Sequence, residues 1–365
     1  MTVRPPYRVV VWGPGVLGSA VLREIARLPE LELVGVLCFS DGKKGQDVGA
    51  FLHGEPTGVL MTTDKDAIVA LAPDVVLFCP QATAGAALES EATQDVLRML
   101  RAGINVIAAN GYHYPAFSGG ELEAALSEAC REGGASVHGT GINPGLVSER
   151  FLTTLTAACT RVHSITVQEV GVGGTVDSAD MMAMIGWGQQ PPPMQLIVDM
   201  AARYYGESIA HACAILGRQV DRVDAEFSYV LADRDYQAGT LTIPAGTMGS
   251  VQHTFTAVVD GRPFLRLEEH FIADPELSPI PLPAKDFWTI TIEGEPTSVR
   301  MLLEMQHSFA RDERFAGDDR TPAAYYATGV AMIQAIPVVV AAEPGFVHPT
   351  VFTRSVPDLR QLAPA

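Results

Sequence analysis

The sequence has few cysteines, few basic residues and no long apolar run, and each shortage excludes a class of protein. Its five cysteines are scattered and never in CxxC spacing, which excludes a disulfide framework and a zinc cluster and favours a reducing, cytoplasmic compartment. No uninterrupted apolar stretch reaches the length of about 18 residues that a membrane span needs. The first apolar run begins at Tyr7, which leaves no room for a signal peptide.

Charge and missing motifs narrow the possible functions further. The net charge of −17 disfavours nucleic acid and anionic membranes as partners, because both need a basic surface. The H-E-x-x-H motif, the nucleophile elbow and the Walker loop are absent, so we expect no metal, no metal-dependent hydrolysis and no phosphoryl transfer. A length of 365 residues predicts two domains, or one domain with a large insertion.

The most informative motif is the glycine-rich stretch Gly13–Gly18, which directly follows the apolar run Tyr7–Trp12. In a dinucleotide-binding turn, the first glycine permits the tight turn and the second lets backbone approach a pyrophosphate. The third glycine lets the following helix pack closely on the strand, and the helix aims its N-terminal amides at the anion. We therefore predict that Gly13, Gly15, Val16, Leu17 and Gly18 bind a dinucleotide.

Alternation of strands and helices continues after this turn and predicts a doubly wound sheet of about six strands. Continuous apolar runs indicate strands buried on both faces of a parallel sheet. The predicted strands are Leu31–Phe39, Gly58–Met61, Asp74–Cys79, Asn105–Ala109 and Ala135–His138, and the predicted helices include Glu91–Ala102 and Glu121–Glu132.

After Pro144 the pattern changes to longer strands with alternating faces, which predicts an α+β domain with a mostly antiparallel sheet. The predicted strands are Val162–Val170, Ala225–Leu231, Val251–Asp260, Pro263–Ala273 and Phe287–Glu293, with a hairpin turn at Asp260-Gly261 and a helix at Met194–Leu216. The predicted fold class is thus α/β, with a Rossmann dinucleotide-binding domain over residues 1–145. A substrate-binding and dimerisation domain follows over 146–322, and the segment 323–365 is expected to return to the first domain.

The region after the second predicted strand bears on which nicotinamide cofactor binds. An NAD-preferring domain places an acidic residue about twenty positions past the last glycine. That count reaches Cys38, and Leu37–Ser40 contains no acid. Ser40, Lys43 and Lys44 offer a hydroxyl and two cations where a 2′-phosphate would lie, so we predict NADP. Asp41 keeps NAD open as an alternative, because a slip of one residue would place it on the ribose.

Three polar side chains in the second half are candidates for the proton donor of a hydride transfer. Alternation puts Glu169 on one face with Ile165 and Val167, puts His253 on an apolar face, and does the same for Glu269. A carboxylate on a buried sheet face either finds a partner or has its pKa raised, which suits a proton donor or an ammonium site. The alternative is a structural Glu–His pair.

A loop in the first half offers a second set of candidates. His113 is a candidate proton carrier in this loop, with Tyr112 as a second catalytic candidate and Tyr114 in the substrate pocket; alternatively the three residues form a partly buried aromatic loop. Within the run 177–188, Met182 and Trp187 could supply apolar walls for a substrate, together with His253; methionines at helical spacing are equally typical of an ordinary core.

Several segments together resemble the dihydrodipicolinate reductase-like superfamily, and most of all its 2,4-diaminopentanoate dehydrogenase and amine dehydrogenase branch. The segments are Val11–Gly18, Gly45–Gly49, Gly103–Ile107, His138–Gly145 and Ala335–Gly345, in the family's order. The resemblance implies a homodimer that uses NADH or NADPH to reduce an imine or to oxidise an amine, with a small ketone, aldehyde or amine as substrate and ammonia as a possible co-substrate. It also implies that the Asn143-Pro144-Gly145 turn lies near the nicotinamide.

The turn itself agrees, because it follows a predicted buried strand and is expected to open a helix at Pro144. Asn143, with Pro80 and Asn110 after two other predicted strands, completes the predicted cofactor-binding set.

One departure from the family pattern concerns the loop Asn110–Pro115. Amine dehydrogenases of this family typically carry a glutamate in this loop, and here the loop has no carboxylate. The resemblance as a whole predicts an oxidoreductase acting on C=N or C–N bonds by reductive amination of small ketones or aldehydes, whereas the missing carboxylate favours a reductase of another substrate. A reductase of a carbonyl or cyclic imine, and a non-catalytic nucleotide-binding protein, are the alternatives.

Overall fold

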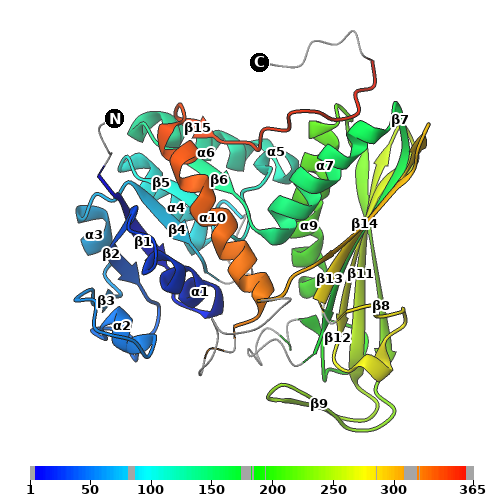
Figure 1. Cartoon of the computed structure of the whole chain (residues 1–365), viewed down its shortest axis with the longest axis horizontal. Coiled ribbons are helices and arrows are strands. Elements are labelled where there is room, and N and C mark those ends of the chain that lie inside the picture. The colour runs from blue at the N-terminus through cyan, green and yellow to red at the C-terminus, as the bar shows by residue number, and fades with distance from the viewer. Residues whose placement is uncertain are drawn as a thin grey trace. The chain divides into compact units, whose positions relative to one another are not determined.

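The structure, a computed structural model, describes residues 5–80, 87–173, 182, 185–193, 195–284, 286–307, 319 and 321–358. The chain divides into two compact units, each built on one large sheet (Figure 1). Unit 1 comprises Met1–Leu146 and Tyr325–Pro349, and unit 2 comprises Val147–Ala324 and Thr350–Ala365.

Unit 1 is built on a parallel sheet of seven strands. Its strands are β1 (Tyr7–Trp12), β2 (Leu31–Leu37), β3 (Met61–Thr62), β4 (Val75–Phe78), β5 (Asn105–Ala108), β6 (Ser136–Gly139) and β15 (Gly345–Phe346). They lie in the order β15-β6-β5-β4-β1-β2-β3, and every pairing is parallel. Without β15 this is the dinucleotide-binding order 3-2-1-4-5-6. In this order successive strands are added on one side of β1 up to β3 and on the other side from β4 onward, so the strand order reverses between β1 and β4.

Buried apolar residues explain why these strands form the centre of the unit. All four residues of β4 are buried, as are the last four of β1, so both faces of the sheet are covered. The helices of the unit are α1 (Val16–Ile25), α2 (Val48–Phe51), α3 (Lys65–Ala70), α4 (Glu91–Arg101), α5 (Pro115–Ser118), α6 (Gly120–Gly133) and α10 (Ala323–Ala341). Side chains cap the starts of α2, α3 and α4: the Ser90 side chain accepts the Thr93 amide at α4, and Asp47 and Asp64 accept amides at the starts of α2 and α3.

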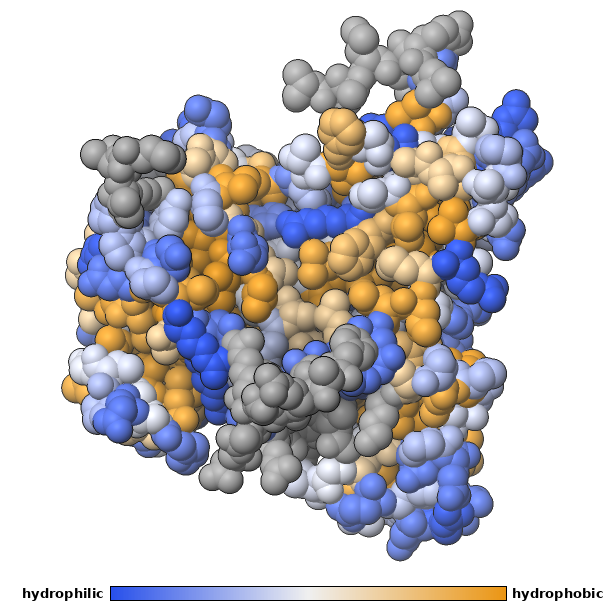
Figure 2. Space-filling view, viewed as in Figure 1, coloured by the Kyte–Doolittle hydropathy of each residue, from blue (hydrophilic) through white to orange (hydrophobic). Residues whose placement is uncertain are grey.

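The helix α10 comes from the far end of the chain and packs into unit 1. Its length and apolar composition would suffice to cross a membrane, as they do for no other helix of the described residues. One side of α10, however, contributes Met332, Ile336 and Val339 to the core cluster around β1 and β4. Apolar side chains also follow its outer side, where Val338 is exposed (Figure 2). Because one side of α10 is packed in the core, its apolar composition is that expected of a core helix.

Unit 2 is built on a mixed sheet of six strands. The strands lie in the order β14 (Val299–Glu304), β13 (Asp286–Glu295), β7 (Arg161–Val172), β12 (Arg262–Ile272), β11 (Met248–Val259) and β8 (Arg222–Leu231). Four contacts are antiparallel and the fifth, between β7 and β12, is parallel. The expected α/β class is therefore confirmed, and the second sheet, expected to be mostly antiparallel, is a mixed sheet with one parallel contact among antiparallel ones.

The other elements of unit 2 connect and cover this sheet. They are the helical segment η2 (Ile142–Phe151, which begins in unit 1), α7 (Leu152–Leu155), η3 (Thr156–Ala158), α9 (Gln195–Ile215), η4 (Pro275–Leu277) and the hairpin β9 (Tyr236–Ala238) and β10 (Leu241–Ile243). Figure 1 shows α9 running beside the sheet, and the Tyr205 ring stacks on Phe255 of β11. The predicted hairpin turn is confirmed, because Asp260 and Gly261 join β11 to β12 with positive φ at both residues.

The expected helix start at Pro144 is wrong. Asn143, Pro144 and Gly145 have non-helical backbone angles, with ψ of 156° at Pro144 and φ of 123° at Gly145. These three residues thus form a kink within η2 rather than a helix start, and Gly145 adopts a φ that L side chains rarely reach.

Candidate functional site

The glycine turn after β1 has the geometry that a dinucleotide phosphate requires. Gly13 has a φ of +97°, and a Cβ at Gly18 would collide with the Gly13 carbonyl oxygen. Both positions therefore require glycine for the turn and for the close approach of α1. A Cβ at Gly15 would meet nothing within 4 Å, so the backbone there faces open space. Because Gly15 is the N-cap of α1, a ligand entering that space meets the helix N-terminus.

Four predicted cofactor-binding residues lie at the same edge of the sheet. Gly13, Pro80, Asn110 and Asn143 follow β1, β4, β5 and β6, which are neighbours in the sheet. Asn110 Nδ2 donates to the Pro80 carbonyl at 2.5 Å and so ties two of these loops together. Ligands of parallel α/β sheets bind at the carboxyl ends of the strands, and this edge includes the reversal between β1 and β4. The residues present thus fit a dinucleotide.

The turn after β2 brings one of the predicted cations to the glycine turn. Lys43 Nζ donates to the Pro14 carbonyl at 2.7 Å and lies 4.9 Å from the centre of the Phe51 ring. Ser40 is exposed at the start of the same turn, where its carbonyl accepts the Lys43 amide. Lys43 is therefore close enough to the glycine turn to contact a phosphate bound there, and Ser40 lies three residues before it in the turn after β2.

The predicted proton-carrier loop of unit 1 is largely packed. The Tyr112 hydroxyl shares a hydrogen bond of 2.8 Å with Thr93 Oγ1, and the side chain lies in the core cluster beside α4. His113 is buried, and a Cβ at Gly139 would lie 2.7 Å from its backbone nitrogen. Tyr114 is half-buried with its ring 6.4 Å from that of His348. Packing explains Tyr112, and a catalytic role for these residues stays a prediction.

In unit 2, strand register brings the three sheet candidates into one row. His253 of β11 lies opposite Glu269 of β12, and Glu269 lies opposite Glu169 of β7. Residues opposite each other on neighbouring strands point to the same face. The row continues to Phe227 on one side of His253 and to Trp288 on the other side of Glu169. The three polar residues that alternation had placed on separate strands are thus adjacent.

Two tyrosines of α9 that were not predicted from the sequence lie at this row: Tyr205 contacts it directly, and the Tyr204 ring packs against that of Tyr205. The Tyr205 hydroxyl donates a hydrogen bond to Glu269, and the Glu169 and Glu269 carboxyl groups share another. Burial, and then the charge of Glu169, raise the pKa of Glu269 well above its usual value. The pKa of Tyr204 is also raised, by burial and by four surrounding glutamates. The feature of the sequence that could have indicated them is a pair of adjacent tyrosines in the middle of an apolar helix.

The remaining two of these glutamates surround a buried histidine. Glu149 of η2 lies 3.8 Å from His211 of α9, and Glu207 is one helical turn before His211. Glu149, Glu207 and His211 are all buried. Neither glutamate was singled out from the sequence, although a glutamate and a histidine four residues apart in an apolar helix mark one face. Unit 2 therefore has four glutamates near Tyr204: Glu207 on α9 itself, Glu149 on η2, and Glu169 and Glu269 on the sheet.

The predicted apolar wall residues lie next to the same row. Met182 and Trp187 belong to one buried cluster with Val251, and Phe227 and Phe271 pack against it. Trp187 Nε1 donates to the Phe271 carbonyl at 3.1 Å, and the rings of Phe227 and Phe271 lie 5.0 and 6.2 Å from that of His253. Of the run 177–188, residues 177–181, 183 and 184 lie outside the described residues.

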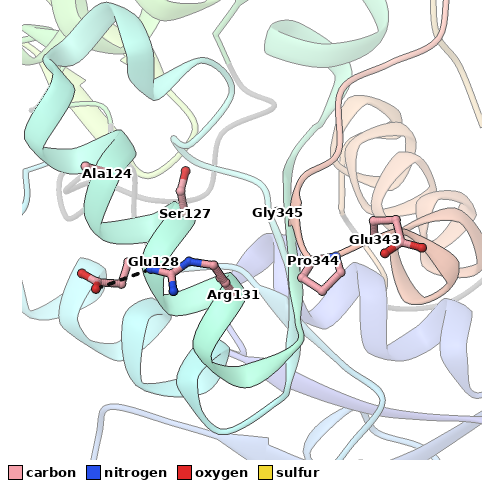
Figure 3. A pocket seen from close by; sticks show the side chains of 7 residues that line it. All are labelled: Ala124, Ser127, Glu128, Arg131, Glu343, Pro344 and Gly345. Atoms are coloured by element: carbon pink, nitrogen blue, oxygen red, sulfur yellow. Dashed lines mark ion pairs between the residues drawn. The ribbon is translucent and has the colours of Figure 1, made fainter. Parts of the chain in front are cut away.

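A surface hollow in unit 1 coincides neither with the predicted cofactor-binding residues nor with the polar row of unit 2. It is lined by α6 and the segment before β15, namely Ala124, Ser127, Glu128, Arg131, Glu343, Pro344 and Gly345 (Figure 3). Gly345 pairs with Ser136 at the amino end of β6, whereas the cofactor-binding residues follow the carboxyl ends. The Glu128–Arg131 ion pair at 3.6 Å is a helix-surface pair one turn apart. None of the predicted site residues lines this hollow.

A metal site is not indicated by the described side chains. Among these residues no group of three or more histidine, cysteine, aspartate or glutamate side chains could hold a metal ion.

Comparison with known proteins agrees with the resemblance read from the motifs. Over 349 residues the chain is 27% identical to an amine dehydrogenase of Streptomyces virginiae, covering 92% of this chain and 93% of the relative. Over 192 residues it is 28% identical to the 2,4-diaminopentanoate dehydrogenase of Acetoanaerobium sticklandii, covering 47% of this chain and 52% of that protein. No family model matches. The predicted resemblance to the amine dehydrogenase branch is confirmed.

Solved structures share the fold. The amine dehydrogenase from Mycobacterium smegmatis has a TM-score of 0.73 at 20% identity, covering 95% of this chain and 97% of that chain. The protein GenD2 from gentamicin A biosynthesis, solved in complex with NAD, has a TM-score of 0.54 at 14% identity, covering 94% of this chain and 90% of that chain. At these identities the likeness concerns the α/β fold with its parallel sheet.

Proposed function

We propose that this chain is a nicotinamide-dependent oxidoreductase of the amine dehydrogenase type. It oxidises a small primary amine and, in reverse, aminates a ketone or aldehyde with ammonia. The observation that carries the proposal is the open Gly15 backbone at the reversal of the unit 1 sheet, in a chain similar to an amine dehydrogenase over 92% of its length. Unit 1 binds the cofactor and unit 2 binds the substrate.

The residues at the carboxyl edge of unit 1 have separate tasks in this proposal. When bound, the nicotinamide supplies the hydride or accepts it. The Gly13–Gly18 turn and the N-terminus of α1 hold the pyrophosphate, and the Asn110–Pro80 hydrogen bond keeps two further loops in position. Asn143 lies after β6, at the same edge, and contacts the nicotinamide end of the cofactor.

The direct test follows NADPH oxidation with a panel of ketones and aldehydes, with and without ammonium. The proposal expects turnover that depends on ammonium, and the reverse oxidation of the corresponding amine. Failure of every substrate under both conditions would contradict it. Turnover that does not depend on ammonium would favour a reductase of carbonyls or cyclic imines, which the absence of a carboxylate in the loop Asn110–Pro115 supports.

NADP is the preferred cofactor in this proposal, and Lys43 is the residue that decides it. Its ammonium group lies at the glycine turn, and an exposed hydroxyl side chain, Ser40, begins the same turn. Replacing Lys43 by alanine is expected to weaken NADPH binding about tenfold while NADH binding changes little, since an ion pair to a 2′-phosphate is lost. Equal losses for the two cofactors would assign Lys43 to the shared pyrophosphate instead.

We also infer a homodimer in the cytoplasm. The family resemblance supports the dimer, and the five free, buried cysteines are consistent with a reducing compartment. Light scattering on the purified chain measures the mass of the assembly, and fractionation of the source cells locates it. A monomer across the accessible concentration range would refute the dimer.

A further inference from the structure

The row His253–Glu269–Glu169–Trp288 in unit 2 has more polar capacity than its neighbours satisfy. His253 is 5% exposed, and neither of its ring nitrogens has a hydrogen-bond partner among the residues that the structure describes. Trp288 is 3% exposed and its Nε1 is likewise unpartnered within the described part of the chain. Buried polar groups in proteins are nearly always satisfied, so the unpartnered His253 ring, which offers an acceptor nitrogen beside a carboxyl pair, indicates a polar ligand that donates hydrogen bonds.

Charge and protonation define what that ligand can be. Glu169 and Glu269 share a hydrogen bond, which needs a proton between them, so the pair carries at most one negative charge while the bond is made. Burial lowers the pKa of His253 to about 4, so its imidazole is neutral at pH 7 and offers an acceptor nitrogen beside Glu269. One negative charge with an adjacent neutral acceptor matches a group that is cationic and donates hydrogen bonds.

The surroundings favour an organic cation over a metal ion. The rings of Phe227, Phe255 and Phe271 all lie within 6.3 Å of the His253 ring, and Tyr205 stacks on Phe255. Aromatic faces bind an alkylammonium through its charge and its carbon chain together. Glu169 is only half-buried, as are Tyr204 and Tyr205 of α9, so the carboxyl pair is not fully enclosed by the chain.

We propose that the Glu169–Glu269 pair, with His253 beside it, is a binding site for the ammonium group of a primary amine. This rests on the proposed function, because it names the charged form in which the substrate is recognised. Unit 2 thus contributes carboxyl groups of its own, while the loop Asn110–Pro115 of unit 1 has none. The ammonium N–H groups donate to Glu169, to Glu269 and to the acceptor nitrogen of His253, and the aromatic rings contact the alkyl chain.

Calorimetric titration of the full chain without cofactor tests the site directly. The ligands are butylammonium and, as an uncharged match, 1-butanol, with potassium chloride as an inorganic competitor. We expect saturable binding of butylammonium, with 1-butanol and potassium each at least about tenfold weaker. Binding of 1-butanol as tight as that of butylammonium would overturn the proposal, and so would equal binding of potassium or no butylammonium binding at all.

Variants locate the binding on the row. Glu169→Gln removes the half-buried carboxylate and is expected to weaken butylammonium binding about tenfold or more. Glu268→Gln is the matched control, because Glu268 precedes Glu269 on β12 and points to the opposite face of the sheet. That control should bind as the original chain does, and thermal unfolding confirms that each variant is folded. His253→Phe, which keeps the aromatic volume, provides a second variant and should also weaken binding.

The outcomes separate the site from the proposed function. Ammonium binding that Glu169→Gln abolishes, in a chain without nicotinamide-dependent turnover, would leave the site standing and refute the function. Turnover of an amine with an unchanged KM in Glu169→Gln, and with no loss of butylammonium binding, would refute the site and leave the function standing.

Discussion

Glu169 and Glu269 lie opposite each other on the parallel strands β7 and β12, and their carboxyl groups share a hydrogen bond. Two carboxyl groups that share a hydrogen bond cannot both ionise without repulsion, so their titrations are coupled. The Tyr205 hydroxyl donates to the same carboxyl group and partly offsets the raised pKa. As the pH rises, a buried carboxyl group with a raised pKa lowers the stability of the fold, whereas a carboxylate in an ordinary ion pair, with its lowered pKa, increases it.

Glu269→Gln is expected to stabilise the protein at alkaline pH. The folded-state pKa of Glu269 lies well above its usual value of 4.5, so its favourable contribution exists at low pH and is lost as the pH rises. Glutamine does not titrate, and the variant should gain roughly 1–2 kcal/mol over the original chain at pH 8 and nothing near pH 4. Urea unfolding at the two pH values measures the difference.

The neighbouring Glu268→Gln provides a control with the opposite sign. His270, whose Nε2 lies 3.6 Å from the Glu268 carboxylate, lowers the pKa of Glu268 to about 2, with help from Gln168 and Arg266. Its contribution is present above pH 4.5 and is lost as the pH falls toward 2, so this variant should be the less stable one at pH 8. If both variants shifted stability in the same direction with pH, the protonation assigned to the pair would be wrong.

His253→Phe is expected to flatten the loss of stability in mild acid. Burial lowers the pKa of His253 to about 4, whereas the unfolded chain binds this proton near 6.5. Stability is therefore intact above pH 6.5 and falls between pH 6.5 and 4, by up to about 3 kcal/mol from this group. Chemical unfolding across this window should show a smaller loss in the variant, and an equal slope would contradict a buried neutral histidine.

Two alanine variants of the glycine turn should separate folding from binding. Gly18→Ala places a Cβ against the Gly13 carbonyl and is expected to lower the free energy of unfolding by about 1–3 kcal/mol. Gly15→Ala meets no atom of the chain within 4 Å and should leave stability unchanged. It should nevertheless weaken NADPH binding about tenfold, because its Cβ occupies the space of the pyrophosphate. Unchanged NADPH affinity in Gly15→Ala would argue against the cofactor position.

Tyr112→Phe tests whether this residue acts in catalysis or in packing. Its hydroxyl is engaged by Thr93 in the core of unit 1, so the variant should lose about 1 kcal/mol of stability and keep its kcat. A proton donor would instead lower kcat by about a hundredfold or more when removed. Thermal unfolding and steady-state kinetics on one preparation distinguish the two roles.

Local chemistry made part of this fold predictable. The Asp260-Gly261 turn follows from the positive φ that both residues adopt, and the buried run of β4 follows from continuous apolar residues. The two-residue strand β15 is too short to leave a periodic signal. The parallel contact between β7 and β12 was equally inaccessible, because alternation shows which side chains share a face and not which way the neighbouring strand runs.

The candidate site shows the same division. Alternation placed Glu169, Glu269 and His253 on apolar faces of three strands, but only the register between these strands makes them neighbours. Tyr204 and Tyr205 contribute through α9, which lies far from β7 in the sequence, and no local pattern indicates which sheet face a helix covers. The glycine turn needed no such long-range information, since its geometry is contained within Gly13–Gly18.

The return of α10 and β15 to unit 1 has a consequence for synthesis. β15 pairs with β6, and α10 fills the core beside β1, so the first sheet is completed by the residues 325–349. During translation the N-terminal unit therefore lacks part of its apolar cover until the residues 325–349 have left the ribosome. A chain cut after Leu146 would lack that cover and would be expected to aggregate, so expression of unit 1 alone requires the C-terminal segment to be joined back to it.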